Sequence, residues 1–152
     1  MTDIVLATIN ARYVHASVGL RYLRANMSAL FDATEIVEFV LGVRPIDMVE
    51  AILKRAPRIV GLGVYIWNIE EMTKVVALLK QVAPDVIVVL GGPEVSYETD
   101  QQKVISDADY VITGWGDVSF AKLCDELIVG NRPQEKIIAG EPPSLADRKS
   151  VV

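Results

Sequence analysis

Glycine and aromatic residues follow several apolar runs of the sequence, and their types suit the binding of a flat ligand. Gly91 and Gly92 end the apolar run of residues 86–90. Because neither has a Cβ, a ligand can approach the backbone closely there, or the chain can turn tightly without one. His15, the only histidine, could ligate cobalt, iron or zinc, or could bond locally within its loop. Five aromatic residues could stack on a ligand or pack together: Tyr13, Tyr65, Trp67, Tyr97 and Trp115.

Alternating strands and helices must position these residues. Apolar runs predict strands at residues 3–9, 34–40, 58–65, 86–90 and 110–113. Helical spacing predicts helices at residues 19–31, 45–56, 69–82 and from Asp117 or Ser119 to 129, with a short helix at 99–106. Residues 135–139 could add an edge strand. The pattern predicts a three-layer, doubly wound α/β domain, flavodoxin-like or Rossmann-like, whose five parallel strands follow the order 2-1-3-4-5.

The loops that follow parallel strands meet at one edge of the sheet, the carboxyl edge, and ligands bind there. The predicted loops are residues 10–17, 65–68, 91–98 and 114–117. They contain few acid–base pairs, which favours a partly apolar binding shelf over a hydrolytic site. Gly61 and Gly63, inside a predicted strand, indicate close approach of a neighbour or a ligand. We expect an exposed apolar surface at this edge, with Ile66 and Trp67 in or beside it.

Several residues are expected to fix helix ends or to fill the core. Ser17 and Asn68 are suitable N-caps, and Pro45 suits a first helical turn. Gly130 is a suitable helix terminator. Cys124 lies on the apolar face of the last helix, which favours a structural role in the core.

Composition limits the class of protein. The 152 residues suit one domain, and 51% of them are hydrophobic, which is typical of a folded chain. The net charge of −5 argues against non-specific nucleic-acid binding. No apolar run is long enough to span a membrane, and the N-terminus does not resemble a signal peptide, so we expect a cytoplasmic protein. One cysteine cannot form an internal disulfide or hold an iron–sulfur cluster by itself.

Four stretches together resemble a known family. They are NARYVHASVGLRYL, VGLGVYIWN, VVLGGPEVSYE and ADYVITGWGDVSFAKLCDEL, and they cover nearly the whole chain in order. The combination resembles the N-terminal cobalamin-binding domain of cobalamin-dependent radical S-adenosylmethionine (SAM) enzymes. Relatives of this kind resemble anaerobic magnesium-protoporphyrin IX monomethyl ester cyclases and methyltransferases. The resemblance implies a flavodoxin-like sheet with the corrin on its carboxyl edge.

The resemblance also implies cofactor-binding positions. Gly91 and Gly92 match the glycine pair that lets the cobalamin nucleotide tail approach the sheet. The family's Ser-x-Leu loop corresponds to Gly63, Val64 and Tyr65, so two of its three positions differ. The family's Thr-Gly-x-Gly turn corresponds to Thr113, Gly114 and Gly116, with Trp115 where glutamate is usual. The Asp-x-His-x-x-Gly motif, whose histidine ligates cobalt, corresponds to Tyr13 and His15, with its glycine one place late at Gly19.

The resemblance further implies a larger parent enzyme. Residues 1–139 would form the cobalamin domain, and residues 140–152 would lead to a radical SAM domain that holds a 4Fe–4S cluster and SAM. The sequence lacks the Cys-x-x-x-Cys-x-x-Cys segment of that domain, so we expect no activity from this fragment alone. The parent would be a methyltransferase or a cyclase. The alternatives are a non-catalytic interaction or regulatory module with a decayed site, and a flavin- or nucleotide-binding domain.

Overall fold

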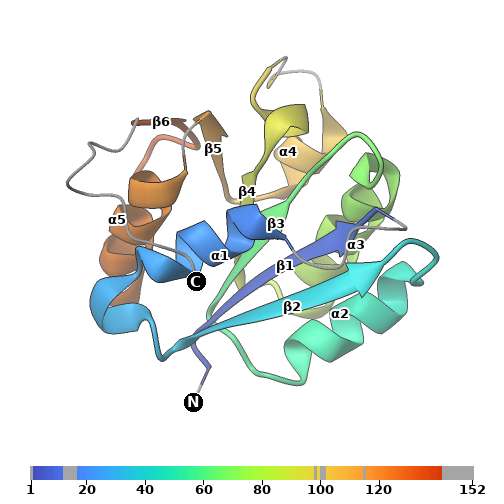
Figure 1. Ribbon diagram of the computed structural model, residues 1–152, viewed down its shortest axis with the longest axis horizontal. Helices are drawn as coiled ribbons and strands as arrows, with labels where there is room; N and C mark the ends of the chain where they lie inside the picture. Colours follow the sequence, from blue (N-terminus) through green and yellow to red (C-terminus); the bar gives the residue numbers. More distant parts are fainter. Residues whose placement is uncertain (1, 12–16, 98, 100–101, 115, 142–152) are drawn as a thin grey trace.

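The computed structural model describes residues 2–11, 17–97, 99, 102–114 and 116–141. Within them, six parallel strands form one sheet in the order β2-β1-β3-β4-β5-β6 (Figure 1). The strands are β1 (Ile4–Asn10), β2 (Thr34–Val40), β3 (Ile59–Gly63), β4 (Ile87–Gly91), β5 (Tyr110–Gly114) and β6 (Ile137–Gly140). The α-helices are α1 (Val18–Ala25), α2 (Pro45–Leu53), α3 (Ile69–Val82), α4 (Lys103–Asp107) and α5 (Asp117–Ile128), with 3-10 helices η1 (Ser28–Leu30) and η2 (Pro93–Val95).

The predicted order of the first five strands is confirmed, but the prediction of a five-stranded sheet is wrong. β6 adds a sixth strand, which pairs in parallel with β5 through the register Val111↔Ile137 to Gly114↔Gly140. Its four residues alternate between exposed and half-buried. β6 corresponds to the edge strand that residues 135–139 are expected to add, shifted toward the C-terminus, and its pairing with β5 makes it part of the sheet. It also extends one residue past the predicted domain boundary at residue 139.

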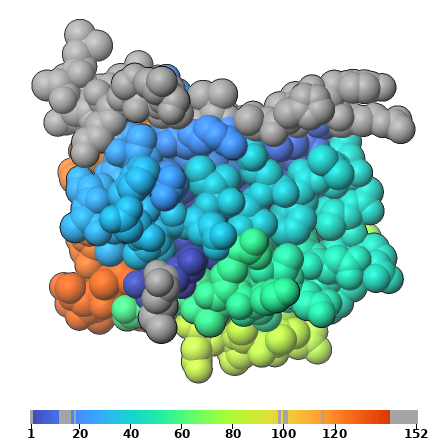
Figure 2. Space-filling view, turned by 60° about the horizontal axis from the view of Figure 1, so that its bottom comes forward, coloured from blue at the N-terminus to red at the C-terminus, as the bar shows by residue number. Residues whose placement is uncertain are grey.

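Helices cover both faces of the sheet, as a doubly wound fold requires. One core cluster joins α2, α3 and α4 to the sheet, and Val60 and Leu62 of β3 point into it. A second cluster joins α1 and α5 to the opposite face, where Leu6 and Phe120 meet. Figure 1 shows α1 next to α5, and Figure 2 shows the edge of the sheet, where β2 in cyan lies between α1 in blue and α2 in teal.

Local sequence explains most helix ends. The Ser17 hydroxyl accepts a hydrogen bond from the N–H of Leu20 and so caps α1, as predicted. Pro45 begins α2 as predicted, since a first-turn residue needs no donor. After α5, Gly130 adopts φ +92°, and the N–H groups of Gly130 and Asn131 reach back to the carbonyls of Leu127 and Glu126. This is a Schellman ending, as expected for glycine at this position.

Three helix predictions need correction. The short helix predicted over residues 99–106 begins only at Lys103, because the N-cap residue Gln102 has an extended backbone. The helix predicted over residues 19–31 ends at Ala25, because Ser28 adopts φ +51° and the chain continues as η1. Asn68 occupies the N-cap position of α3, but its side chain makes no capping hydrogen bond. Its amide instead turns toward the sheet, where it finds better partners.

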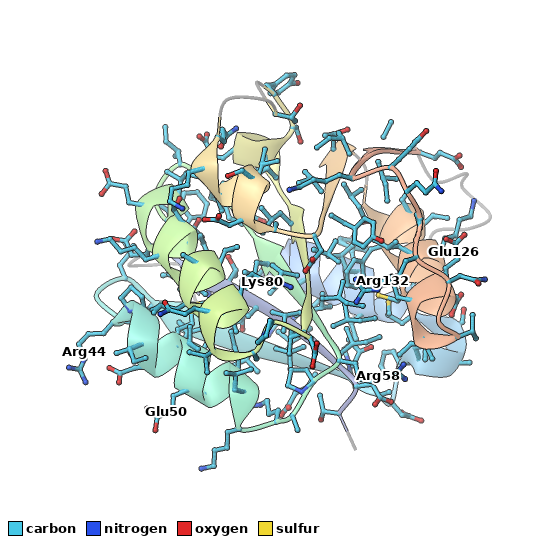
Figure 3. The ribbon with its side chains drawn as sticks, turned by 180° about the vertical axis from the view of Figure 1, so that it is seen from behind. Arg44, Glu50, Arg58, Lys80, Glu126 and Arg132 are labelled. Carbon is cyan, nitrogen blue, oxygen red and sulfur yellow. The ribbon has the colours of Figure 1, made fainter. Side chains whose placement is uncertain are left out.

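An ion pair ties α3 to the start of β4. Lys80, labelled on α3 in Figure 3, donates to the carbonyl of Val86 and to the carboxylate of Asp109, both at 2.8 Å. The same Asp109 oxygen accepts the N–H of Val88 at 2.8 Å. The pair therefore fixes the turn that precedes β4, at the opposite end of that strand from Gly91.

Candidate functional site

A cavity of about 170 Å³ lies between the sheet, α1 and α5. It opens at the carboxyl edge, where β3, β4 and β5 end. Its lining residues are Leu6, Gly19, Leu20, Leu23, Gly61, Leu62, Gly63, Tyr65, Val89, Leu90, Gly91, Gly92, Ile112, Gly114, Gly116, Asp117 and Phe120. Helices α1 and α5 form its walls and the sheet forms its floor. The register of the strands therefore decides which residues lie side by side on the floor.

Glycines form the floor at the carboxyl edge. The register places Thr8, Gly63 and Gly91 in one row across β1, β3 and β4. A Cβ on Gly91 would meet nothing closer than the carbonyl of Ile112 at 4.0 Å, so the space above it is open. One row deeper, Leu6, Gly61 and Val89 are aligned. Because Gly91 adds no side chain to the upper row, room is left there for a ligand beside the backbone.

Gly92 is required by the fold. Its missing Cβ makes room for protein backbone, and not for a ligand as the sequence suggested. Although Gly92 also lines the cavity, it adopts φ +109°, and a Cβ there would lie 2.4 Å from the carbonyl oxygen of Val64. The group that approaches Gly92 closely is therefore the backbone after β3. This contact is reinforced by the N–H of Val64, which donates to the carbonyl of Gly91 at 2.8 Å.

Gly61 and Gly63 also lie against protein neighbours. A Cβ on Gly61 would lie 2.8 Å from a methyl group of Leu6 and 3.0 Å from the ring of Phe120. A Cβ on Gly63 would lie 3.2 Å from the ring of Tyr65. The expected close approach to these two glycines is confirmed. The neighbours that approach them are the side chains of Leu6, Phe120 and Tyr65.

Aromatic residues form the rim of the cavity. The rings of Tyr65 and Trp67 stack with centroids 4.6 Å apart and planes 2° from parallel. The indole N–H of Trp67 donates to the carbonyl of Ile9 at 2.8 Å, which fixes the pair against the end of β1. Ile66, Trp67 and Tyr97 are 76%, 39% and 77% exposed. Exposed apolar side chains therefore do stand at this edge, as expected, while Trp115 lies outside the described residues.

Asn68 is fully buried and holds the loop after β3. Its Oδ1 accepts the N–H of Tyr65 at 2.8 Å. Its Nδ2 lies 3.0 Å from the carbonyl of Ile9 and 3.2 Å from Oγ1 of Thr8. Thr8 in turn donates to the carbonyl of Gly63 at 2.8 Å. This network joins the ends of β1 and β3, so it sets the position of Tyr65 at the rim.

Glu38 fixes the start of α1, which forms one wall of the cavity. Its carboxylate accepts two hydrogen bonds from Arg21, each 3.1 Å long, and one from the backbone N–H of Ser17. Oε1 also accepts from Asn10 at 3.4 Å. The hydrogen bond from Arg21 holds the pKa of the Glu38 carboxyl below its usual value, although partial burial opposes this shift.

The structure brings most of the predicted cofactor-binding positions together. Those that line the cavity are Gly63, Tyr65, Gly91, Gly92, Gly114 and Gly116. Val64 points into the core on the opposite face, and the Thr113 hydroxyl lies 3.5 Å from the carbonyl of Ile138 in β6. Tyr13 and His15 lie outside the described residues. Within the described residues, no three His, Cys, Asp or Glu side chains are grouped to hold a metal ion.

Sequence reasoning missed the apolar wall of the cavity. It comprises Leu20 and Leu23 of α1, Phe120 of α5, Leu6 of β1 and Ile112 of β5. Leu20, Leu23 and Phe120 fall at helical spacing with other apolar residues, and such positions are usually core. The signal that could have separated them is Gly61 and Gly63 in the strand that they face, because glycines there leave these side chains with less to pack against.

Comparisons with known proteins assign the class. The fold is a doubly wound domain with a cavity at the carboxyl edge, which is where ligands bind in proteins of this class. The family model described as the B12 binding domain matches residues 4–124. The chain therefore belongs to the B12-binding domain family.

Individual relatives agree with this assignment. The chain is 36% identical over 69 residues, 45% of its length, to the cobalamin-dependent radical SAM methyltransferase TokK of Streptomyces tokunonensis, and the match covers 10% of TokK. A solved cobalamin-binding protein of Desulfitobacterium hafniense DCB-2 is 26% identical with a TM-score of 0.60, over 82% of this chain and 58% of that one.

The same fold occurs in a further solved structure. The radical SAM methyltransferase TsrM of Kitasatospora setae superposes with a TM-score of 0.59 at 23% identity, over 87% of this chain and 26% of TsrM. The chain thus spans less than two thirds of each of these relatives. No helix in the described residues has the length and apolar character needed to cross a membrane.

Proposed function

We propose that this chain binds cobalamin with its nucleotide tail in the cavity between α1 and α5 and its corrin over the carboxyl edge. The observation that carries the proposal is the open floor at Gly91, where nothing lies closer than 4.0 Å to the position of a Cβ, so a planar group can lie against the backbone there. Gly114 and Gly116 widen the same cavity on the side of β5 and α5. These residues fit the group, since none of them places a side chain in the space that the tail requires.

Cobalamin when bound supplies cobalt-centred chemistry, and the residues of this chain bind it, orient it and exclude water. Tyr65 and Trp67 form a rigid stacked pair at the rim that suits contact with a flat macrocycle. The exposed Ile66 and Tyr97 add apolar surface beside that pair. Two further assignments stay predictions, because both residues lie outside the described residues. They are His15 as a cobalt ligand and Tyr13 as a cofactor-binding residue.

We propose further that the chain is the cobalamin domain of a radical SAM enzyme, a methyltransferase or a cyclase, located in the cytoplasm. Support comes from the likeness to TokK and TsrM, whose names describe radical methyltransferases. A second domain with a 4Fe–4S cluster and SAM would cover the open corrin face. The domain would then end at Gly140, where β6 ends, with residues 141–152 as the linker. The family match does not favour the alternatives of an interaction module or a flavin domain.

Absorbance spectroscopy with hydroxocobalamin tests the proposal. The protein should shift the visible spectrum of the cofactor and keep its colour after desalting. The variant Gly91→Leu should bind at least tenfold more weakly, because its side chain would fill the cavity.

Gly91→Ala is the matched control, since it adds a Cβ into open space and leaves most of the cavity free. It should retain binding, and both variants should keep the far-ultraviolet circular dichroism of the wild type. Colourless wild-type protein would contradict the proposal. Equal affinity of Gly91→Leu would place the tail elsewhere.

A further inference from the structure

The inner part of the cavity is lined by hydrocarbon. One row below the glycine floor, Leu6 and Val89 flank Gly61. The ring of Phe120, from α5, lies over Gly61, 3.0 Å from where a Cβ on Gly61 would be. Leu20 and Leu23 of α1, with Ile112 of β5, also line the cavity.

Polar side chains lie only at the outer end of this lining. Among the described lining residues, the polar side chains are Tyr65, which follows β3, and Asp117, which begins α5. The backbone beneath the inner part belongs to β3, which is hydrogen-bonded to β1 on one side and β4 on the other. The sheet ladder therefore already occupies its donors and acceptors. Among the described residues, a group that reaches the level of Gly61 meets no spare hydrogen-bonding partner there.

We infer that this cavity selects cobamides whose lower base is an apolar ring, such as dimethylbenzimidazole, over cobamides whose lower base is a purine, such as adenine. The inference rests on the proposed function, because it requires the nucleotide tail to occupy the cavity. Adenine carries an amino group and ring nitrogens that are hydrogen-bonded in water. Burying them without partners costs free energy, whereas the methyl groups of dimethylbenzimidazole gain from burial.

The size of the selectivity follows from the same physics. An apolar pocket rejects a polar analogue of similar shape by about a hundredfold at most, because the analogue can tilt its polar edge toward water. The cavity opens at the carboxyl edge, so the base can turn its polar edge toward water there. We therefore expect a preference of about tenfold to a hundredfold.

Titration of the full chain with three corrinoids tests the inference. They are cobalamin, the adenine-containing cobamide, and cobinamide, which lacks the nucleotide tail. All three are used in their dicyano forms, so that neither base coordinates cobalt and differences in base-on equilibrium do not contribute. The expected order of affinity is cobalamin first, the adenine cobamide at least tenfold weaker, and cobinamide also weaker than cobalamin.

Three other outcomes of the titration would contradict the inference, and they differ in what they say of the proposed function. Equal affinities for cobalamin and the adenine cobamide would overturn the inference alone. Equal affinities for cobalamin and cobinamide would also overturn it, since the base would not be in the cavity, while cobalamin binding itself would stand. No binding of any of the three would overturn the proposed function together with the inference.

A pair of leucine variants locates the selectivity. Leu23→Gln places an amide in the cavity wall and should reduce the preference for cobalamin to less than about threefold. Leu30→Gln is the matched control, because Leu30 is also partly buried against the same core cluster but does not line the cavity. It should keep the wild-type preference. Loss of the preference in both variants, with dichroism unchanged, would overturn the assignment to the cavity wall.

Discussion

Gly92 lies so close to the backbone after β3 that a Cβ on it would be 2.4 Å from the carbonyl oxygen of Val64. With φ at +109°, this position also disfavours any residue with a side chain. We expect Gly92→Ala to lower the free energy of unfolding by about 3 kcal/mol or to prevent folding, from the combined cost of the contact and the backbone conformation. Urea denaturation measures the loss.

The neighbouring glycine is the control for this prediction. The Cβ of Gly91→Ala would meet nothing closer than the carbonyl of Ile112 at 4.0 Å, so the change should alter stability by less than about 1 kcal/mol. Similar losses of stability at both positions would show that the end of β4 tolerates no side chain. The distinction between Gly92, which contacts Val64, and Gly91, which faces open space, would then be wrong.

Asn68→Asp should destabilise the protein strongly at neutral pH. The change keeps the shape but removes the donor that reaches Ile9 and Thr8, and it buries a charge. We expect a loss of about 3 kcal/mol at pH 7. Burial raises the pKa of the introduced carboxyl above its unfolded value, so the loss should shrink as pH falls and the carboxyl is protonated.

Thermal or urea unfolding between pH 4 and pH 7 checks this dependence. Asn26→Asp is the comparison, because the Asn26 amide donates to the carbonyl of Tyr22 near a helix end and is half-buried. Its effect should stay below about 1 kcal/mol. A loss at Asn68 that grows toward acid would contradict the role of the amide as a buried donor.

Glu38→Gln should remove a stabilisation that depends on pH. The folded state lowers the pKa of Glu38 from its ordinary 4.5, so its contribution is fully present above that value and is lost as pH falls through the folded pKa. We expect the variant to be about 2 kcal/mol less stable at pH 7, and the gap to close in acid. Denaturant midpoints measured from pH 3 to pH 7 would show this.

Glu35→Gln provides the control for Glu38. Glu35 pairs with Arg55 at 2.7 Å, but both side chains are more exposed than Glu38, and exposed pairs contribute less than about 1 kcal/mol. A gap of equal size at both positions, or a gap at Glu38 that does not vary with pH, would mean that the contacts to Ser17 and Arg21 add little.

Cys124 should resist modification in the native protein. Burial, with a smaller effect of Asp125, raises the pKa of its thiol, so little reactive thiolate is present at pH 8. Ellman's reagent should react with it only after unfolding, and faster in Gly92→Ala than in the wild type. Rapid labelling of native wild-type protein would show that α5 opens readily or that the thiol is accessible.

The sequence alone determined the order of the first five strands, because the alternation of apolar runs with amphipathic segments leaves few topologies for a parallel sheet. It also located the carboxyl-edge loops and the glycines of the cavity, since glycine inside or after a buried strand is a local signal. The helix at Ile69–Val82 and the strand at Thr34–Val40 match their predicted ranges.

Only the tertiary structure decided how those glycines differ. Gly91 and Gly92 are adjacent and alike in sequence, but one faces an open cavity and the other the backbone of Val64. The pairing of β6 with β5, the inward turn of Asn68 and the meeting of Leu6 with Phe120 over Gly61 are likewise contacts between distant segments. Periodicity reports which side of an element is buried, whereas strand register and helix placement decide what each buried residue meets.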